Sequence, residues 1–319
     1  MGLELLSFWT VNIAFAGFTA PKLLWLRENE PENFARIRKI MLPKDYLGYR
    51  LTGQYSTDYS DASGTLLLDV AHKRWSNEMC ELCGVEPDWL PPLHESWEVV
   101  GRALPEYGLP NAVVAAGAGD NAAAAIGMGT VEHGSCNISL GTSGTVFLAQ
   151  DRFSVDGRNA LHSFAHANGK WHLMGCILSA ASCRKWWLED ILGTGDYAGD
   201  EAAAGAADSG GVIFLPYLMG ERSPHNDTAV RGAFVGLSAS ITRAQMSRAV
   251  MEGVAFAIRD CLEAARQAGI APGAATLCGG GARSGVWRQI VADVLNIPIR
   301  IPETEQGPAY GAALLAMRG

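Results

Sequence analysis

The spacing of apolar and polar positions changes from helical in the first third of the chain to strand-like after about residue 130. The change follows residues 113–128, which start as a short apolar run, pass through glycines and become an alanine-rich helix. Asp120 and Asn121 are the polar side chains of this stretch, placed where the predicted strand gives way to the helix. Such residues often cap a helix by accepting hydrogen bonds from its free N–H groups. A carboxylate in apolar surroundings is costly unless it is paired or used, so a functional role is the alternative.

The first third of the chain is predicted to be helical, with turn-rich segments between the helices. Apolar spacing and start signals place helices at residues 17–29, 31–38, 43–53 and 75–84. Residues 58–65 combine aspartates, glycine and small hydroxyl side chains, which predicts a loop. Such a loop either lines a polar pocket or only joins two elements.

Beyond residue 130 the pattern predicts strands. Residues 136–140 and 145–148 form two of them, and the turn Gly141-Thr142-Ser143-Gly144 between them is typical of a hairpin. A turn of this kind aims several backbone N–H groups at one point and can bind an anion. An ordinary hairpin turn is the other interpretation.

The remaining apolar runs predict alternating strands and helices. Strands are expected at 171–174, 212–215 and 297–301, and helices at 179–192 and from 307 onward. Thr242 and Gln245 form a capping box that opens a long helix.

A second glycine turn follows the strand predicted at residues 275–278. The run Gly279-Gly280-Gly281-Ala282 leads through Ser284 into another helix. A strand, a glycine turn and a helix bring a phosphate or nucleotide close to backbone N–H groups. The run matches neither GxGxxG nor GxxxxGKS, so it is not interpreted as a dinucleotide fingerprint or a P-loop.

Two residue pairs have spacings found in metal sites. His162 and His166 have the spacing of a helical metal pair, and Cys80 and Cys83 form a CxxC pair. Because no third ligand accompanies either pair, we predict structural histidines, packed thiols and no metal ligands. The odd number of cysteines, 7, is typical of reduced thiols in a cytoplasmic protein.

Composition narrows the classes of partner. The 319 residues, 48% hydrophobic and 18% charged, are ordinary for a soluble globular protein of about two domains. The formal charge of -8 argues against a nucleic-acid partner. The apolar runs are too short to cross a membrane, and the first residues lack the basic region of a signal peptide.

Taken together, these segments resemble the FGGY family of carbohydrate kinases. Residues 17–29, with Lys22 and Trp25, are similar to the family's first signature, and residues 232–252 are similar to its second. Residues 42–46, 58–65 and 220–226 are most similar to members that phosphorylate D-xylulose. The resemblance implies an α/β fold of the actin/hexokinase-like (ribonuclease H-like) type, in which ATP and sugar bind between two domains.

The resemblance also implies roles for the residues singled out above. Asp120 would be the catalytic base that takes the proton of the sugar hydroxyl, and Asn121 would contact the sugar. The cofactors would be ATP and Mg²⁺. Phosphate would bind at Gly141, Thr142, Ser143 and Gly144, and adenosine at Gly279, Gly280, Gly281, Ala282 and Ser284. The product would be D-xylulose 5-phosphate; a ribulose, fuculose or glycerol kinase, or a non-catalytic nucleotide- or sugar-binding remnant, are the alternatives.

The family's first hairpin, with Asp-x-Gly-Thr and a Mg²⁺-linked aspartate, is not found in this sequence, and neither is a later histidine segment of the sugar site. We therefore expect residues 1–130 to be an incomplete N-terminal domain on the sugar and catalytic side, and 131–319 to be the C-terminal, nucleotide domain. Such a chain alone is expected to turn over slowly or not at all. Unpaired strand edges favour a homodimer or a partner that supplies the missing N-terminal half.

Overall fold

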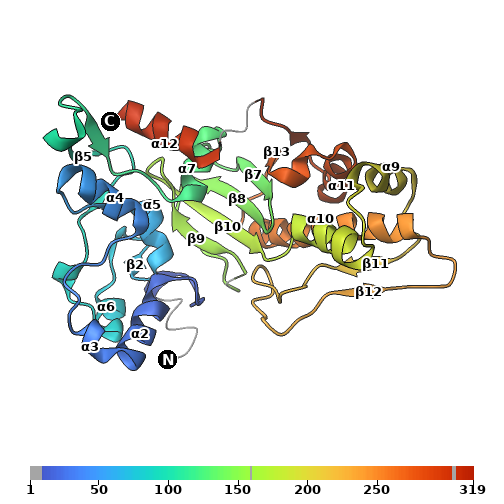
Figure 1. Cartoon of the computed structure of the whole chain (residues 1–319), viewed down its shortest axis with the longest axis horizontal. Helices are drawn as coiled ribbons and strands as arrows, with labels where there is room; N and C mark the ends of the chain where they lie inside the picture. Colours follow the sequence, from blue (N-terminus) through green and yellow to red (C-terminus); the bar gives the residue numbers. More distant parts are fainter. Residues whose placement is uncertain (1–8, 159, 304–306) are drawn as a thin grey trace.

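A six-stranded sheet forms the centre of the molecule (Figure 1), for which a computed structural model describes residues 9–158, 160–303 and 307–319. The strand order is β14-β13-β7-β8-β10-β9. Along the chain the strands are β7 (Cys136–Leu140), β8 (Gly144–Gln150), β9 (His162–Ala165), β10 (Trp171–Ile177), β13 (Ala275–Cys278) and β14 (Ile299–Arg300).

The sheet is mixed. Strands β7, β8, β10 and β9 are antiparallel neighbours, whereas β13 runs parallel to both β7 and β14. The hairpin predicted at residues 136–148 is confirmed, with Ser139 opposite Thr145 and Leu140 opposite Gly144. Because β7 and β13 are parallel neighbours, the two predicted glycine turns leave the sheet at the same edge.

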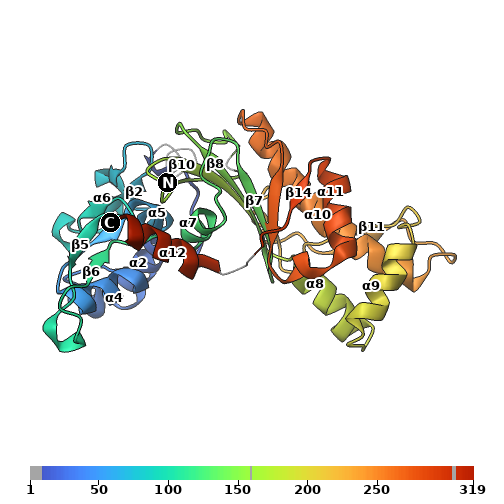
Figure 2. The same cartoon turned by 90° about the horizontal axis from the view of Figure 1, so that it is seen from above.

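The two faces of the sheet carry different helices (Figure 2). The largest core lies between the sheet and helices α10 (Arg243–Gln267) and α11 (Gly285–Leu295). Thr242 caps α10 in the predicted capping box. On the opposite face, α7 (Asp120–Gly127) packs through Ala125 against Phe147 and Ala149 of β8.

The other C-terminal elements differ in part from the prediction. The helix expected over 179–192 is α8 (Ala181–Lys185) followed by a π-helical segment, η4 (Trp186–Ile191). Within η4, the buried Trp187 donates its indole N–H to Ser247 on α10 at 2.8 Å. The remaining elements are α9 (Tyr197–Ala206), β11 (Ile213–Leu215), β12 (Ala233–Val235), η5 (Gly280–Arg283) and α12 (Gly307–Arg318).

The N-terminal part consists of short helices and three two-stranded pairs. The helices are α2 (Thr19–Asn29), α3 (Pro31–Phe34), α4 (Pro43–Thr52), α5 (Tyr59–Ala62), η1 (Ser63–Thr65), α6 (Asn77–Cys83), η2 (Pro87–Trp89) and η3 (Pro105–Tyr107). The paired strands are β1 (Thr57–Asp58) with β4 (Leu93–His94), β2 (Leu68–Asp69) with β3 (Arg74–Trp75), and β5 (Val99–Arg102) with β6 (Val113–Ala115).

Two predictions for this part are wrong. The helix expected over 31–38 ends at Phe34, because it has no buried residue to hold a longer element. The loop expected over 58–65 is instead helical and mostly buried, since α5 and η1 follow each other there. The side chain of Asp58 caps α5 and accepts hydrogen bonds from the N–H groups of Ser60 and Asp61.

Helix α12 returns across the sheet and packs closely on α7 (Figure 2). A Cβ atom on Gly311 would lie 1.7 Å from the carbonyl oxygen of Ala123 and 3.0 Å from the nitrogen of Gly127. Only a residue without a side chain allows this approach. The crossing fixes the start of α12 beside α7.

The two pairs with metal-like spacing are buried. His162 and His166 lie on and just after strand β9, so their spacing does not place them on one helical face. Burial lowers the pKa of His166 to about 4, and its ring bonds the carbonyl oxygen of Thr130. Cys80 and Cys83 pack in a hydrophobic core with α2 residues. Within the described ranges, no helix combines the length and apolar character needed to span a bilayer.

Candidate active site

Asp120 begins helix α7 with its carboxylate exposed. Gly119 is the residue before the helix, so Asp120 takes the first helical position and is not the N-cap. Its Oδ1 accepts hydrogen bonds from the backbone N–H of Asn121 at 2.7 Å and from the side-chain amide of the same residue at 3.0 Å. Asp120 is therefore not at the N-cap position, although its carboxylate accepts the free N–H of Asn121, and its side chain is exposed at the start of the helix.

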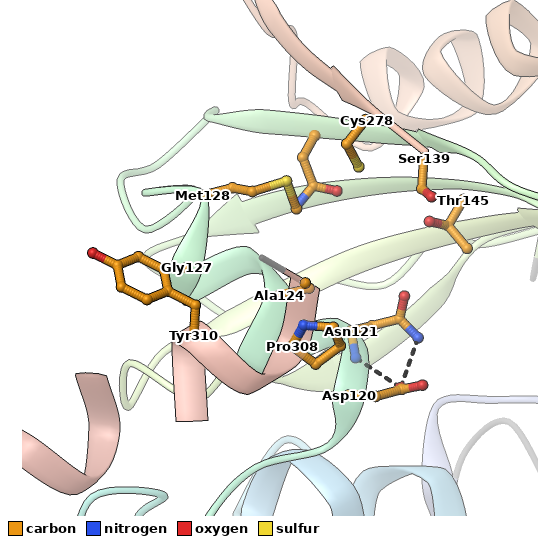
Figure 3. A pocket seen from close by; sticks show the side chains of 12 residues that line it. Asp120, Asn121, Ala124, Gly127, Met128, Ser139, Thr145, Cys278, Pro308 and Tyr310 are labelled. Carbon is orange, nitrogen blue, oxygen red and sulfur yellow. Dashed lines mark hydrogen bonds between the residues drawn. The ribbon is translucent and has the colours of Figure 1, made fainter. Parts of the chain in front are cut away.

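Asp120 and Asn121 line two separate cavities. The first, here called the hairpin-side cavity, has a volume of about 220 Å³ and lies between α7, the start of α12 and the sheet (Figure 3). The second, here called the Arg222 cavity, has a volume of about 200 Å³ and lies between α5, the start of α7 and strands β9 and β10. The start of α7 is the wall that the two cavities share.

The hairpin-side cavity is polar where the sheet faces it. Asn137 and Ser139 of β7, Thr145 of β8 and Cys278 of β13 line the cavity. The side chains of Ser139, Thr145 and Cys278 lie on the side of the sheet that faces α7 (Figure 3). From α12, Pro308 and Tyr310 close the opposite side. None of these residues was predicted as a site residue from the sequence. The alternation Cys-Asn-Ile-Ser-Leu of β7 nevertheless places Asn137 and Ser139 on one face of the strand.

The Arg222 cavity contains charges of both signs. Asp61 and Asp120 line it together with Arg222. The Arg222 guanidinium lies 4.5 Å from the centroid of the Phe15 ring, and its Nε donates to His162 Nε2 at 2.8 Å. Cationic and carboxylate groups that converge on one cavity can bind a polyhydroxylated molecule through several hydrogen bonds.

Asp61 is a half-buried carboxylate whose charge is poorly compensated. Burial raises the pKa of Asp61 to about 7, the ammonium group of Lys44 partly opposes this shift, and Asp58, Asp45 and Asp120 add to it. Lys44 Nζ lies 3.9 Å from the Asp61 carboxylate but closer to Asp45 and Asp58. The pKa of the Asp61 carboxyl group is thus raised toward neutral pH.

Asp61→Asn should change the pH dependence of stability. Because the folded-state pKa of Asp61, about 7, exceeds the ordinary value of 3.8, the folded protein holds an extra proton between these pH values. The contribution of Asp61 to the free energy of unfolding therefore falls as pH rises through this window. The variant should gain stability relative to the parent from pH 4 to pH 7, measured by urea unfolding, with no further gain above it. A stability difference that stays constant across the window would contradict the raised pKa.

The turn Gly141–Gly144 presents free N–H groups. The carbonyl oxygen of Thr142 accepts from the N–H groups of Ala180 and Ser182, and that of Gly141 accepts from Ala181, all at the start of α8. Since N–H and C=O point in opposite directions across a trans peptide, the N–H groups of Thr142 and Ser143 point away from α8. Neither donates a hydrogen bond within the described part of the chain. The arrangement has the character of an anion-binding turn.

The second glycine turn lies against the first. Gly279 has a φ of +88°, and a Cβ atom there would lie 2.8 Å from the backbone of Leu140, the residue before Gly141. Gly280, by contrast, is exposed, with open space where a Cβ would be. Ser284 caps α11 by accepting the N–H of Trp287 at 3.0 Å. The structure therefore brings the two predicted turns together at one edge of the sheet.

Sequence profiles assign the two halves of the chain to one family. The profile of the FGGY family of carbohydrate kinases, N-terminal domain, matches residues 4–127, and that of the C-terminal domain matches residues 136–319. The chain belongs to the FGGY family of carbohydrate kinases.

Curated relatives within this family include xylulose kinases. The chain is 45% identical over 315 residues to the xylulose kinase of Escherichia coli (strain K12), covering 96% of this chain and 65% of the relative. It is 38% identical to the xylulose kinase of Bacillus subtilis (strain 168), covering 97% of this chain and 64% of the relative. The chain thus spans about 65% of the length of the curated relatives that it matches.

Solved structures share the fold. A xyloylose kinase from Brucella ovis has a TM-score of 0.94 and 46% identity, covering 98% of this chain and 66% of the other. A ligand-bound xylulose kinase from Lactobacillus acidophilus has a TM-score of 0.94 and 27% identity, covering 99% of this chain and 66% of the other. The FGGY chain therefore has the actin/hexokinase-like α/β fold expected from its sequence.

Proposed function

We propose that this FGGY chain takes part in the ATP-dependent phosphorylation of a pentulose, D-xylulose, to D-xylulose 5-phosphate, with Asp120 as the general base. The observation that carries the proposal is the position of Asp120 in the wall shared by the two cavities. A general base must lie within hydrogen-bond reach of the attacking hydroxyl, and that hydroxyl meets the γ-phosphate where the sugar and nucleotide cavities adjoin. The names of the relatives support D-xylulose as the sugar.

The sugar is placed in the Arg222 cavity. Arg222, Asp61 and Asn121 supply a cation, a carboxyl group and an amide for its hydroxyl groups. Asp120 accepts the proton of the reacting hydroxyl, whose oxygen then forms a bond to the γ-phosphorus of ATP while the bond to ADP breaks. Positioning and charge neutralisation supply most of the catalysis in phosphoryl transfer.

ATP is placed along the sheet edge, beside the hairpin-side cavity. The N–H groups of Thr142 and Ser143, which donate to no other described residue, fit phosphate oxygens. The Gly279–Ala282 turn next to them is the proposed adenosine side. Ser284 belongs to the same proposal, although its hydroxyl also caps α11. We place the boundary of the sugar-side and nucleotide-side domains at residues 130–131, between α7 and β7.

Mg²⁺ would be bound mainly by the phosphates of the nucleotide. Among the described residues, no group of three or more His, Cys, Asp or Glu side chains could hold a metal ion. Mg²⁺ usually keeps several waters and binds few carboxylates besides the substrate phosphates, so the nucleotide would supply most of its ligands other than water. When bound, the ion would neutralise charge on the phosphates.

Substrate choice is tested by an ADP-release assay with D-xylulose, L-ribulose, L-fuculose and glycerol. We expect the highest kcat/KM with D-xylulose. Preference for another of these sugars would replace D-xylulose with that sugar in the proposal. Binding of ATP or sugar by calorimetry without turnover of any sugar would instead favour a binding protein.

Gly280→Asp should weaken nucleotide binding. Gly280 is exposed and has open space around it, so the aspartate fits the fold but places a side chain and a negative charge where the phosphate-bearing nucleotide must approach. Like charges brought together at a binding site are costly, and we expect the ADP affinity to fall about tenfold or more. Calorimetric titration with ADP measures the effect.

Gly157→Asp is the matched control for this change. Gly157 is also exposed and open, but it lies far from both glycine turns in the sequence and lines neither cavity. The control should bind ADP as the parent does. Equal ADP affinity in the Gly280→Asp variant would remove the nucleotide from the second glycine turn.

A further inference from the structure

The carboxylate of Asp120 depends on its backbone for its position. Its hydrogen bonds within the described part of the chain come from Asn121, the next residue of the same helix. Hydrogen bonds from elements outside α7 can therefore fix the position of this carboxylate by fixing the turn that precedes the helix. That turn connects β6 to α7 and ends at Gly119.

Ser60 of α5 holds the last residue of this turn. Its Oγ accepts the backbone N–H of Gly119 at 3.0 Å and donates its own proton to Asp58 Oδ2. A hydroxyl has one proton, so a donation fixed on Asp58 leaves the Oγ lone pairs for the N–H of Gly119. A Cβ atom on Gly119 would lie 3.3 Å from the Cα of Asp61, so α5 also limits the turn by close contact.

Asp58 is the centre of this network. Its carboxylate is fully buried, pairs with Lys44 Nζ at 3.1 Å and accepts the hydroxyl of Ser96 at 2.7 Å. A buried charge requires such pairing. The α5 capping role of Asp58 uses the backbone N–H groups of Ser60 and Asp61 and does not account for the hydroxyl and ammonium contacts.

The same network holds the earlier part of the turn. Lys44 Nζ donates to the carbonyl oxygen of Ala116 at 3.2 Å, and the carbonyl oxygen of Ser96 accepts the N–H of Gly117 at 3.0 Å. Three residues in contact with Asp58 thus reach three positions of the β6–α7 turn. The turn, residues 116–119, has two glycines, which leave its conformation to such contacts.

We propose that Ser60 and Asp58 are positioning residues that hold the β6–α7 turn, and through it Asp120, in place for proton transfer. The proposal rests on the function proposed above for Asp120. A displacement of about 1 Å in a catalytic group can cost on the order of 10²-fold in rate. Loss of one hydrogen bond to the turn should have a smaller effect, about tenfold.

Ser60→Ala tests the link, with Ser63→Ala as the matched control. Ser63, three residues after Ser60, is also buried, and its hydroxyl also accepts a backbone N–H, that of Ala165 at 3.0 Å. It does not contact the β6–α7 turn. Both variants lose the same chemical group. We expect kcat to fall about tenfold in Ser60→Ala, while Ser63→Ala keeps the parent kcat. Because Ser60 also lines the Arg222 cavity, the KM for the sugar should rise as well, so the fall in kcat is the readout of positioning.

Amide hydrogen exchange gives a readout that does not need turnover. Exchange in a peptide covering residues 116–123 should become faster in Ser60→Ala and stay unchanged in Ser63→Ala. Equal kcat in the two variants, a rise in KM without a fall in kcat, or unchanged exchange in Ser60→Ala would each overturn the positioning role. An Asp120→Asn variant that keeps its activity would instead count against the proposed function, and exchange would still decide the role of Ser60.

Discussion

Replacing Asp120 by asparagine should lower kcat by about 10²- to 10⁴-fold, the usual range for removing a general base. Asparagine has nearly the same size and can still accept the two hydrogen bonds from Asn121 through its carbonyl oxygen. It cannot accept the proton of the sugar hydroxyl. The KM for the sugar and the midpoint of thermal unfolding should change little, because Asp120 is exposed and is not the helix cap. Kinetics with D-xylulose and ATP measure the effect.

Asp196→Asn is the matched control for that experiment. Asp196 is exposed at the N-terminus of another helix, where it caps α9 by accepting the N–H of Gly199 at 2.8 Å. Since asparagine caps a helix about as well as aspartate, this variant should keep both its stability and its kcat. A kcat for Asp120→Asn within a factor of about two of the control would rule out general-base catalysis by Asp120.

The sequence predicted the sheet best where strands and turns follow local rules. The hairpin of β7 and β8 and the capping box of α10 were located because alternation and capping signals act over a few residues. The helix expected over 31–38 failed because its length depends on burial against other elements, which local spacing does not reveal.

The candidate site was predictable only in part. Asp120 and Asn121 were identified because they are polar in an apolar run, and the glycine turns because their composition is unusual. Arg222, Asp61 and Tyr310 reach the two cavities from separate elements, so tertiary packing alone brings them there. The alternation in β7 was the one local signal for Asn137 and Ser139.

The segment 58–65 shows why polarity misled the prediction. Its aspartates and hydroxyls indicated a loop, yet the segment is largely helical, and Asp58, Ser60 and Ser63 are buried. Their polar groups are compensated by Lys44, by the N–H of Gly119 and by that of Ala165. A buried polar segment is stable when distant partners satisfy it, and those partners cannot be seen in the local sequence.

The crossing of α7 and α12 should be the most sensitive packing contact near the site. Gly311→Ala would place a methyl group 1.7 Å from the carbonyl oxygen of Ala123, so the two helices must separate. Because the obstructing atoms belong to the backbone, no side-chain rotation relieves the contact. Overpacking of this kind costs about 1–3 kcal/mol and occasionally more.

Separation of the helices should also open the hairpin-side cavity, because Pro308 and Tyr310 form its α12 wall. We therefore expect Gly311→Ala to lower Tm by several degrees, about 2–4 °C for each kcal/mol in a domain of this size, and to weaken ADP binding.

The matched control is Gly48→Ala in α4, where a Cβ meets nothing within 4 Å. That change should leave ADP affinity intact and keep or raise Tm, since alanine favours a helix over glycine by about 1 kcal/mol. Thermal unfolding and calorimetry of both variants test the crossing. If Gly311→Ala matched Gly48→Ala in Tm and ADP affinity, the close approach of α12 to α7 could not be what shapes the cavity.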